Sequence, residues 1–204
     1  VAVSGYYKTS NDVGVFGRIS FLIFIVVLGI ESARQTVARL KKGRRVEELE
    51  QFALNDSMTG MYNRNAYDYF VKNEKDFEGY VIVTFDLNNL KQCNDQYGHR
   101  AGDEYIINAA RIIEDNFERY GKCYRIGGDE FCCIIPKGRY FKIERVMHKI
   151  DQDVEILNHK NIIPVPVGIA YGYAVFTADD TDPEKVRERA DEDMYRNKKA
   201  MKQS

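Results

Sequence analysis

The chain has 204 residues, which is enough for one domain of about 150 residues and an additional segment. It carries 30 Lys and Arg against 31 Asp and Glu, a formal net charge of −1. This balance excludes a protein that binds nucleic acid through bulk positive charge, so we expect no nucleic-acid partner. The first residue is Val rather than Met, which indicates a piece of a longer protein.

The segment 13–30, VGVFGRISFLIFIVVLGI, is apolar apart from Arg18 and Ser20. As a helix it would rise about 27 Å, close to the roughly 30 Å of a hydrocarbon core. It starts too late and runs too long for the core of a signal peptide. We therefore predict a transmembrane helix, with 1–12 as an extracytoplasmic stub or the end of a fragment. Arg18 shortens the uninterrupted apolar run, so a buried or interfacial helix is the alternative.

Basic residues follow this segment against one acid, Glu31; they are Arg34, Arg39, Lys41, Lys42, Arg44 and Arg45. Such an excess of Lys and Arg marks the cytoplasmic side of a span. The sequence therefore predicts a protein of the inner or cell membrane whose C-terminal part is cytoplasmic. A short stub followed by one span fits the last helix of a larger membrane unit. We therefore expect a sensory region to precede this chain.

The segment 31–54 is charged and its apolar residues follow a helical spacing that breaks at Gly43. This pattern predicts a signalling helix that forms a two-stranded coiled coil with a phase break, and hence a homodimer. A solvated linker helix is the alternative interpretation.

The rest of the chain alternates between strand-like and helix-like patterns. The expected order is strand 79–85, helix 101–120, hairpin 123–136, helix 143–157, strand 165–176 and a last helix that starts at Pro183. This order, with its central hairpin, predicts a split βαβ sheet of the α/β (α+β) class. Small residues alternate with large ones in 165–176, which indicates that another element packs closely against one face of that strand.

The four cysteines are Cys93, Cys123, Cys132 and Cys133, and none of their spacings matches a zinc site. Adjacent residues of a strand point to opposite faces, so we expect Cys132 and Cys133 on opposite sides of the sheet. We interpret all four as reduced thiols of a cytoplasmic domain.

Three carboxylates are expected to lie near one another. Asp86 follows the first strand, and Asp129 and Glu130 follow Gly127-Gly128, a pair that suits a turn because glycine tolerates positive φ. In a split βαβ sheet the first strand lies beside the central hairpin, so its end can reach the turn. Converging carboxylates repel unless a cation lies between them, and Mg²⁺ prefers such oxygen ligands together with substrate phosphates. An acidic, solvated turn is the alternative.

Four segments resemble the motifs of the GGDEF-domain diguanylate cyclases. They are NDSMTGMYNR from Asn55, FDLNNLKQCNDQYGHRAGDEYI from Phe85, RIGGDEF from Arg125 and ADEDMYRNKKAMK from Ala190. The resemblance covers 55–204 and implies a catalytic domain similar to the palm of adenylyl cyclases and polymerases. It implies that two GTP molecules are condensed into cyclic di-GMP, with release of pyrophosphate, by two domains that face each other. A catalytically silent module that binds GTP is the alternative.

The resemblance also implies roles for single residues. Asp86, the backbone carbonyl of Leu87 and Asp129 would bind two ions of Mg²⁺ or Mn²⁺ per site. Asp129 would also take the proton of the ribose 3′-hydroxyl, and Glu130 would complete the acidic metal and catalytic cluster.

Further residues would bind the substrate. Asn94 and Asp103 would hydrogen-bond guanine, with His99 in the same motif, and Gly127 and Gly128 would let the backbone approach phosphate. Lys198 and Lys202, four residues apart on one helix, would reach the triphosphate. Taken singly, His99 would more readily be a turn or helix-entry residue than a ligand contact, and Asn94 with Asp95 would be turn formers. Asp103 could favour a helix N-terminus, and the two lysines could form a solvated face.

Two departures from the family pattern are visible. Lys202 stands where relatives commonly have Arg, which removes a bidentate fork for phosphate. Many relatives also have an Arg-x-x-Asp site that binds product, but here its two positions hold Glu118 and Gly121. We therefore expect this inhibitory site to be missing.

Overall fold

The computed structural model describes residues 17–18, 20–37, 53–138 and 142–201. The chain divides into two units, Val1–Glu50 and Gln51–Ser204, and each is described by itself.

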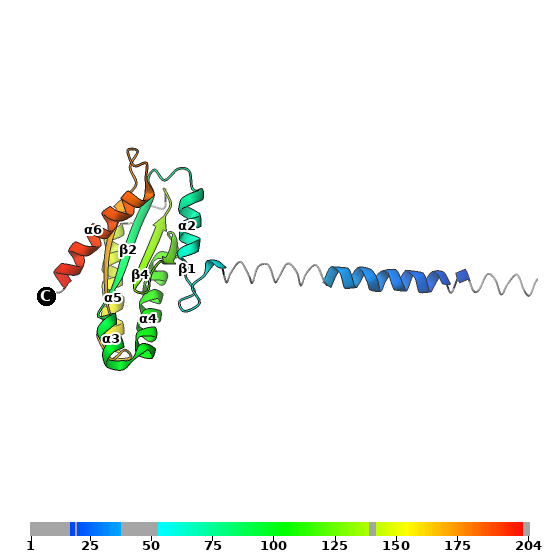
Figure 1. Cartoon of the computed structure of the whole chain (residues 1–204), viewed down its shortest axis with the longest axis horizontal. Coiled ribbons are helices and arrows are strands. Elements are labelled where there is room, and N and C mark those ends of the chain that lie inside the picture. The colour runs from blue at the N-terminus through cyan, green and yellow to red at the C-terminus, as the bar shows by residue number, and fades with distance from the viewer. Residues whose placement is uncertain (1–16, 19, 38–52, 139–141, 202–204) are drawn as a thin grey trace, which may run out of the picture. The chain divides into compact units, whose positions relative to one another are not determined.

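In the first unit the described residues form a helix whose stretch Ser20–Val37 has a mean hydropathy of 1.5 and is not buried (Figure 1). Its length and composition are sufficient to cross a membrane. The predicted span 13–30 lies partly outside the described residues. The helix also continues past Ile30 to Val37, so no break separates the apolar segment from the charged one that follows. Most of the predicted coiled coil, at 38–52, lies outside the described residues.

The second unit is built on one five-stranded sheet flanked by helices (Figure 1). The strand order is β1 (Tyr62–Asn63), β3 (Lys122–Arg125), β4 (Glu130–Ile135), β2 (Val81–Asn88) and β5 (Gly168–Val175). The helices are α2 (Arg64–Asn73), α3 (Leu90–Tyr97), α4 (His99–Phe117), α5 (Ile143–His159) and α6 (Pro183–Met201). Strands β1 and β3 are parallel and the other pairs are antiparallel. The predicted α/β class, the central hairpin and the placement of the first long strand beside it are confirmed.

The two faces of the sheet carry separate cores. Val83, Phe85 and Leu87 belong to a cluster with residues of α4 and α5. Ile82, which directly precedes Val83, belongs to a cluster with residues of α2 and α6. Cys133 lies in the first cluster and Cys132 in the second, so the predicted division of these two cysteines is confirmed.

Strand β5 shows why its small residues alternate with large ones. A Cβ atom at Gly172 would lie 2.0 Å from the backbone nitrogen of Met194 and 2.4 Å from the carbonyl oxygen of Ala190. Helix α6 therefore packs directly on this backbone, as the pattern predicted, and only glycine fits there.

Two expectations need correction. Strand β2 runs to Asn88, because Leu87 and Asn88 still pair with Ile169 and Gly168 of β5, so Asp86 lies inside the strand rather than at its end. The two-residue strand β1 was not expected, since so short a segment has no periodicity to detect.

Candidate active site

The pairing of β2 with β4 sets the centre of the site. Asp86 lies directly opposite Glu130, and the backbone N–H of Leu87 donates to the carbonyl oxygen of Asp129 at 3.1 Å. The register of one antiparallel ladder therefore places the signature carboxylates beside the first strand. Asp129 is half-buried and Glu130 is exposed.

Lys198 of α6 forms an ion pair with Asp86, and their side chains are 24% and 16% exposed. The predicted role of Lys198 at the triphosphate stays a prediction, because in this structure its ammonium neutralises a carboxylate. Lys202, the second predicted phosphate ligand, lies outside the described residues.

The three carboxylates do not form one compact ligand set. In the described part of the chain no three His, Cys, Asp or Glu side chains lie close enough together to hold a metal ion. The convergence of the three carboxylates on a metal ion therefore stays a prediction: the ladder places Asp86 opposite Glu130 and Leu87 beside Asp129, but their side chains do not form such a group in this structure. The donors still suit a hard cation: Asp86 already holds the positive charge of Lys198, and Glu130 lies directly across the ladder.

The signature turn differs from the expected tight turn. In the described residues the glycines with positive φ are Gly60, Gly79, Gly98 and Gly138, so neither glycine of the signature is among them. The loop 126–129 is instead closed by two backbone N–H groups, of Ile126 and Gly127, which donate to the carbonyl oxygen of Glu130 at 3.0 and 3.2 Å.

The two signature glycines have different steric roles. A Cβ atom at Gly127 would lie 2.8 Å from Oε2 of Glu130, whereas nothing lies within 4 Å of a Cβ built at Gly128. Gly127 therefore makes room for the neighbouring carboxylate. The exposed Gly128 leaves the backbone open to an approaching group.

Arg125 holds the turn from behind. Its Nη2 donates to the carbonyl oxygen of Gly128 at 2.8 Å and its Nη1 donates to Oδ1 of Asp56 at 3.0 Å. Asp56 also accepts from the backbone N–H and the hydroxyl of Thr59, at 2.9 and 2.8 Å. Burial acts to raise the pKa of Asp56, but the hydrogen bonds from Thr59 and Arg125 outweigh it and lower that pKa. This pair links two of the quoted motifs, and residue-by-residue reasoning missed it.

The predicted guanine residues lie on two consecutive helices joined at Gly98, which has a φ of 82°. Asn94 is half-buried on α3, and its Oδ1 would lie 1.9 Å from a Cβ atom at Gly102. The structure thus brings Asn94 against α4, one residue before the exposed Asp103. His99 is exposed and is the first residue of α4, which agrees with the alternative of a helix-entry residue.

Tyr105 fixes these helices to the sheet. Its hydroxyl accepts from the backbone N–H of Gly168 at 2.7 Å and donates to the carbonyl oxygen of Asn88 at 2.5 Å. Burial raises its pKa, so the phenol remains protonated and able to donate. Tyr105 therefore sets the position of α4 relative to the end of β2. The helical spacing of 101–120 includes Tyr105, but no pattern in the sequence predicted the partners of its hydroxyl.

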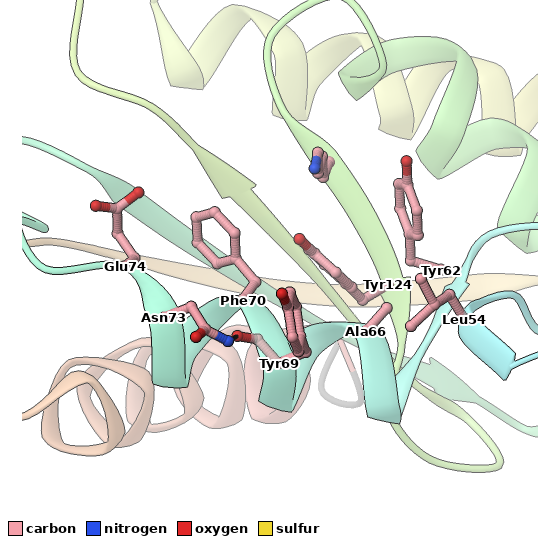
Figure 2. Close-up of a pocket in the computed structure, with 9 residues that line it drawn as sticks. Leu54, Tyr62, Ala66, Tyr69, Phe70, Asn73, Glu74 and Tyr124 are labelled. Carbon is pink, nitrogen blue, oxygen red and sulfur yellow. Dashed lines mark hydrogen bonds between the residues drawn. The ribbon is translucent and has the colours of Figure 1, made fainter. Parts of the chain in front are cut away.

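Two hollows in the described residues are candidates for a binding site. One, of about 520 Å³, lies between the signature hairpin and α6 and is bordered by Glu130, Thr84 and Asp191. The other, of about 370 Å³, lies among aromatic side chains of β1, α2 and β3, including Tyr62, Tyr69 and Phe70 (Figure 2). The second hollow contains none of the predicted site residues, so the carboxylates and the first hollow define the candidate site.

Comparisons with known proteins assign the chain to a family. The family model described as "Diguanylate cyclase, GGDEF domain" matches residues 53–204. The chain is 31% identical over 147 residues to the bifunctional diguanylate cyclase/cyclic di-GMP phosphodiesterase MucR of Pseudomonas aeruginosa, covering 68% of this chain and 22% of that protein. It is 28% identical over 158 residues to the diguanylate cyclase DgcS of Shewanella oneidensis, covering 74% of this chain and 52% of that protein. The chain thus spans at most about half the length of these two relatives.

Solved structures support the same fold. The coiled coil and GGDEF domain of DgcB from Caulobacter crescentus, solved in complex with c-di-GMP, superposes with a TM-score of 0.70 at 23% identity, covering 85% of this chain and 95% of that one. A microbial GGDEF domain studied with cyclic di-GMP gives a TM-score of 0.55 at 27% identity, covering 72% of this chain and 94% of that one.

Proposed function

Because the chain belongs to the GGDEF family, we propose that it is a diguanylate cyclase that condenses two GTP molecules into cyclic di-GMP and releases pyrophosphate. The observation that carries the proposal is the pairing of Asp86 with Glu130 beside the signature turn, with the cation of Lys198 at Asp86. A carboxylate that already accommodates a positive charge next to an open turn suits a metal-bound triphosphate.

Each half of the reaction forms one bond and breaks one. The 3′-oxygen of one GTP attacks the α-phosphorus of the other, and the bond to the β-phosphate breaks so that pyrophosphate leaves. Asp129 accepts the proton of the 3′-hydroxyl, a role for which its half-buried position at the turn is suitable. The 3′-oxygen of the second GTP attacks the α-phosphorus of the first in the same way, and this second bond closes the ring.

Asp86, the carbonyl of Leu87, Asp129 and Glu130 would hold two divalent ions, Mg²⁺ or Mn²⁺. Such ions neutralise charge on the phosphates and lower the pKa of a bound hydroxyl. With a cation held by Asp86, the ammonium of Lys198 would be free to bind the triphosphate, because its present partner would be neutralised.

Substrate selection would rest on α3 and α4. Asn94 and Asp103 present an amide and a carboxylate from adjacent helices, which match the acceptors and donors on the edge of guanine. The hydroxyl of Tyr105 keeps these helices in register with the carboxylates.

One domain supplies one GTP site, so the proposal requires two copies that face each other. The apolar stretch Ser20–Val37 would tether each copy to the membrane with the catalytic domain in the cytoplasm. The charged segment that follows would hold two copies together and pass on a signal from a preceding sensory region.

The test is incubation of the whole chain, purified in detergent micelles, with GTP and Mg²⁺, followed by mass analysis of the products. Cyclic di-GMP and pyrophosphate are expected from the wild type. GTP that binds but remains unconverted would instead identify the silent regulatory module.

A further inference from the structure

Cys123 of β3 and Cys133 of β4 lie directly opposite each other in the hairpin that carries the signature turn. The N–H of Ile126 donates to the carbonyl of Glu130, so these two opposite residues form a hydrogen-bonded pair. Hydrogen-bonded and non-hydrogen-bonded pairs alternate along an antiparallel ladder, so Cys123 and Cys133, three pairs farther along, form a non-hydrogen-bonded pair. Side chains are closest at such pairs, and the two Sγ atoms are 3.0 Å apart. Position and contact therefore both suit a bond between the sulfurs.

The two thiols differ in access. Cys133 is fully buried, whereas Cys123 is 6% exposed and lies before the short stretch of β3 that pairs with β1. Burial raises the pKa of the Cys133 thiol well above its ordinary value, and its contact with Cys123 raises it further. Oxidation would therefore begin at Cys123, and the pair stays reduced while no oxidant is present.

We propose that Cys123 and Cys133 form a dithiol that small two-electron oxidants, such as hydrogen peroxide, convert reversibly into a cross-strand disulfide that lowers cyclase activity. The sulfur of Cys123 attacks one peroxide oxygen, which gives a sulfenic acid and one water. The sulfur of Cys133 then attacks the sulfenic sulfur, and the second water leaves. Two thiols lose two protons and two electrons, and the peroxide takes up both.

The consequence for activity rests on the proposed function. A disulfide holds its two Cβ atoms about 3.8 Å apart, closer than the roughly 4.5–5.5 Å of opposite residues in an antiparallel ladder. The bond would therefore narrow and twist the hairpin three residues from Glu130, whose register opposite Asp86 positions the carboxylates. A displacement of about 1 Å in a catalytic group can cost about 100-fold in rate.

The experiment treats the whole chain, in detergent, with hydrogen peroxide, blocks the remaining thiols and digests with trypsin. Cleavage after Lys122, Arg125 and Lys137 places Cys123 and Cys133 on separate peptides, so a disulfide is read directly as a linked pair. The Cys132→Ala variant is the matched control. The thiol of Cys132 lies on the opposite face of the same strand, so the linked pair must still form when this thiol is removed.

We expect the linked peptides in the wild type and in Cys132→Ala, and not in Cys123→Ser. The oxidised wild type should unfold at a temperature about 5 °C higher or more, since the bond constrains the unfolded chain. Its cyclase rate should fall about tenfold or more and return with dithiothreitol, whereas Cys123→Ser should keep its rate in peroxide.

Three results would overturn the proposal. They are the absence of a linked pair, a linked pair that involves Cys132, and a disulfide-linked chain whose cyclase rate equals that of the chain with free thiols. If the reduced chain makes no cyclic di-GMP, the proposed function fails separately. The peptide mapping and the unfolding temperature then decide whether the dithiol exists.

Discussion

On one face of the sheet the side chains of Val83, Phe85 and Leu87 are at most 2% exposed and pack against α4 and α5, whereas on the other face Thr84 and Asp86 lie beside α6. Both sets belong to one strand and alternate along it. The first face is apolar along its whole length, but the second changes from Ile82 to a hydroxyl and then to a carboxylate. Along β2, the residues that stabilise the fold thus point to one face of the sheet, and the polar residues near the candidate site point to the other.

The largest expected effect is on the polar side of this comparison. Asp129→Asn should lower the cyclase rate about 1000-fold or more and leave the thermal unfolding midpoint nearly unchanged, because the change removes a charge and preserves shape. Steady-state turnover and a melting curve measure the two quantities. An unaltered rate would remove Asp129 from the catalytic centre.

The apolar face should show the opposite behaviour. Phe85 is 1% exposed and meets Phe117 edge to face at 5.5 Å, so Phe85→Ala should lower the free energy of unfolding by about 3–5 kcal/mol. Denaturant unfolding measures this loss. Tyr69→Ala is the control, since Tyr69 is 67% exposed and its loss should change the stability by less than about 0.5 kcal/mol. Equal losses in the two variants would contradict the assignment of stability to the buried face.

Most of the architecture was predictable because long periodic segments report which face is buried. The hairpin, the start of α6 at Pro183 and the close approach at Gly172 all follow from local pattern. Strand β1 does not, because two residues that pair with β3 depend on a contact about sixty positions away.

The site was predictable in its residue types and less so in its contacts. The resemblance identified Asp86 and Lys198, but their ion pair joins positions 112 apart and depends on how α6 crosses the sheet. The hydrogen bonds of Arg125 with Asp56 and of Tyr105 with Asn88 have the same origin. The periodicity of the sequence predicts which residues are buried, but it does not predict which group a buried polar side chain contacts.

The preference for one nucleotide base tests whether α3 and α4, which lie on the apolar face, also take part in substrate binding. We expect GTP to be preferred over ATP, and Asn94→Ala to reduce that preference, because a group that pairs with guanine is left unpaired against adenine at a cost of about 1–3 kcal/mol. The ratio of kcat/KM for the two nucleotides measures this. Equal rates with GTP and ATP in the wild type would mean that Asn94 and Asp103 do not recognise the base.

A smaller effect is expected behind the signature turn. Arg125→Lys keeps the charge but cannot contact Gly128 and Asp56 together, so the cyclase rate should fall about tenfold through poorer placement of the turn. Arg64→Lys is the matched control: Arg64 also reaches the turn, but its contact with the carbonyl of Ile126 is exposed and 3.5 Å long. If both variants lose activity equally, the two contacts of Arg125 have no special role.

The smallest expected effect is that of product on the rate. In the Arg-x-x-Asp site that the family resemblance leads us to look for, the Arg would be a fork for product and the Asp an acceptor. Here Glu118 is exposed and presents a negative charge to an anionic ligand. Gly121 has no side chain, and a Cβ atom there would lie 2.2 Å from the carbonyl oxygen of Ile134, so the backbone leaves no room for an Asp.

Cyclic di-GMP present from the start should therefore leave the progress curve nearly unchanged, and control should pass to dimerisation. The Glu118→Arg variant sharpens the test, because it restores the attractive charge while Gly121 still lacks the acceptor, and weak inhibition at most is expected. Arg119 and Lys122 are the nearby cations from which another product site could be built, and Lys122 already lies over the rings of Tyr62 and Phe70, at 5.4 and 6.0 Å. Strong inhibition of the wild type that GTP does not relieve would show that such a site exists, and Lys122→Met should then abolish it.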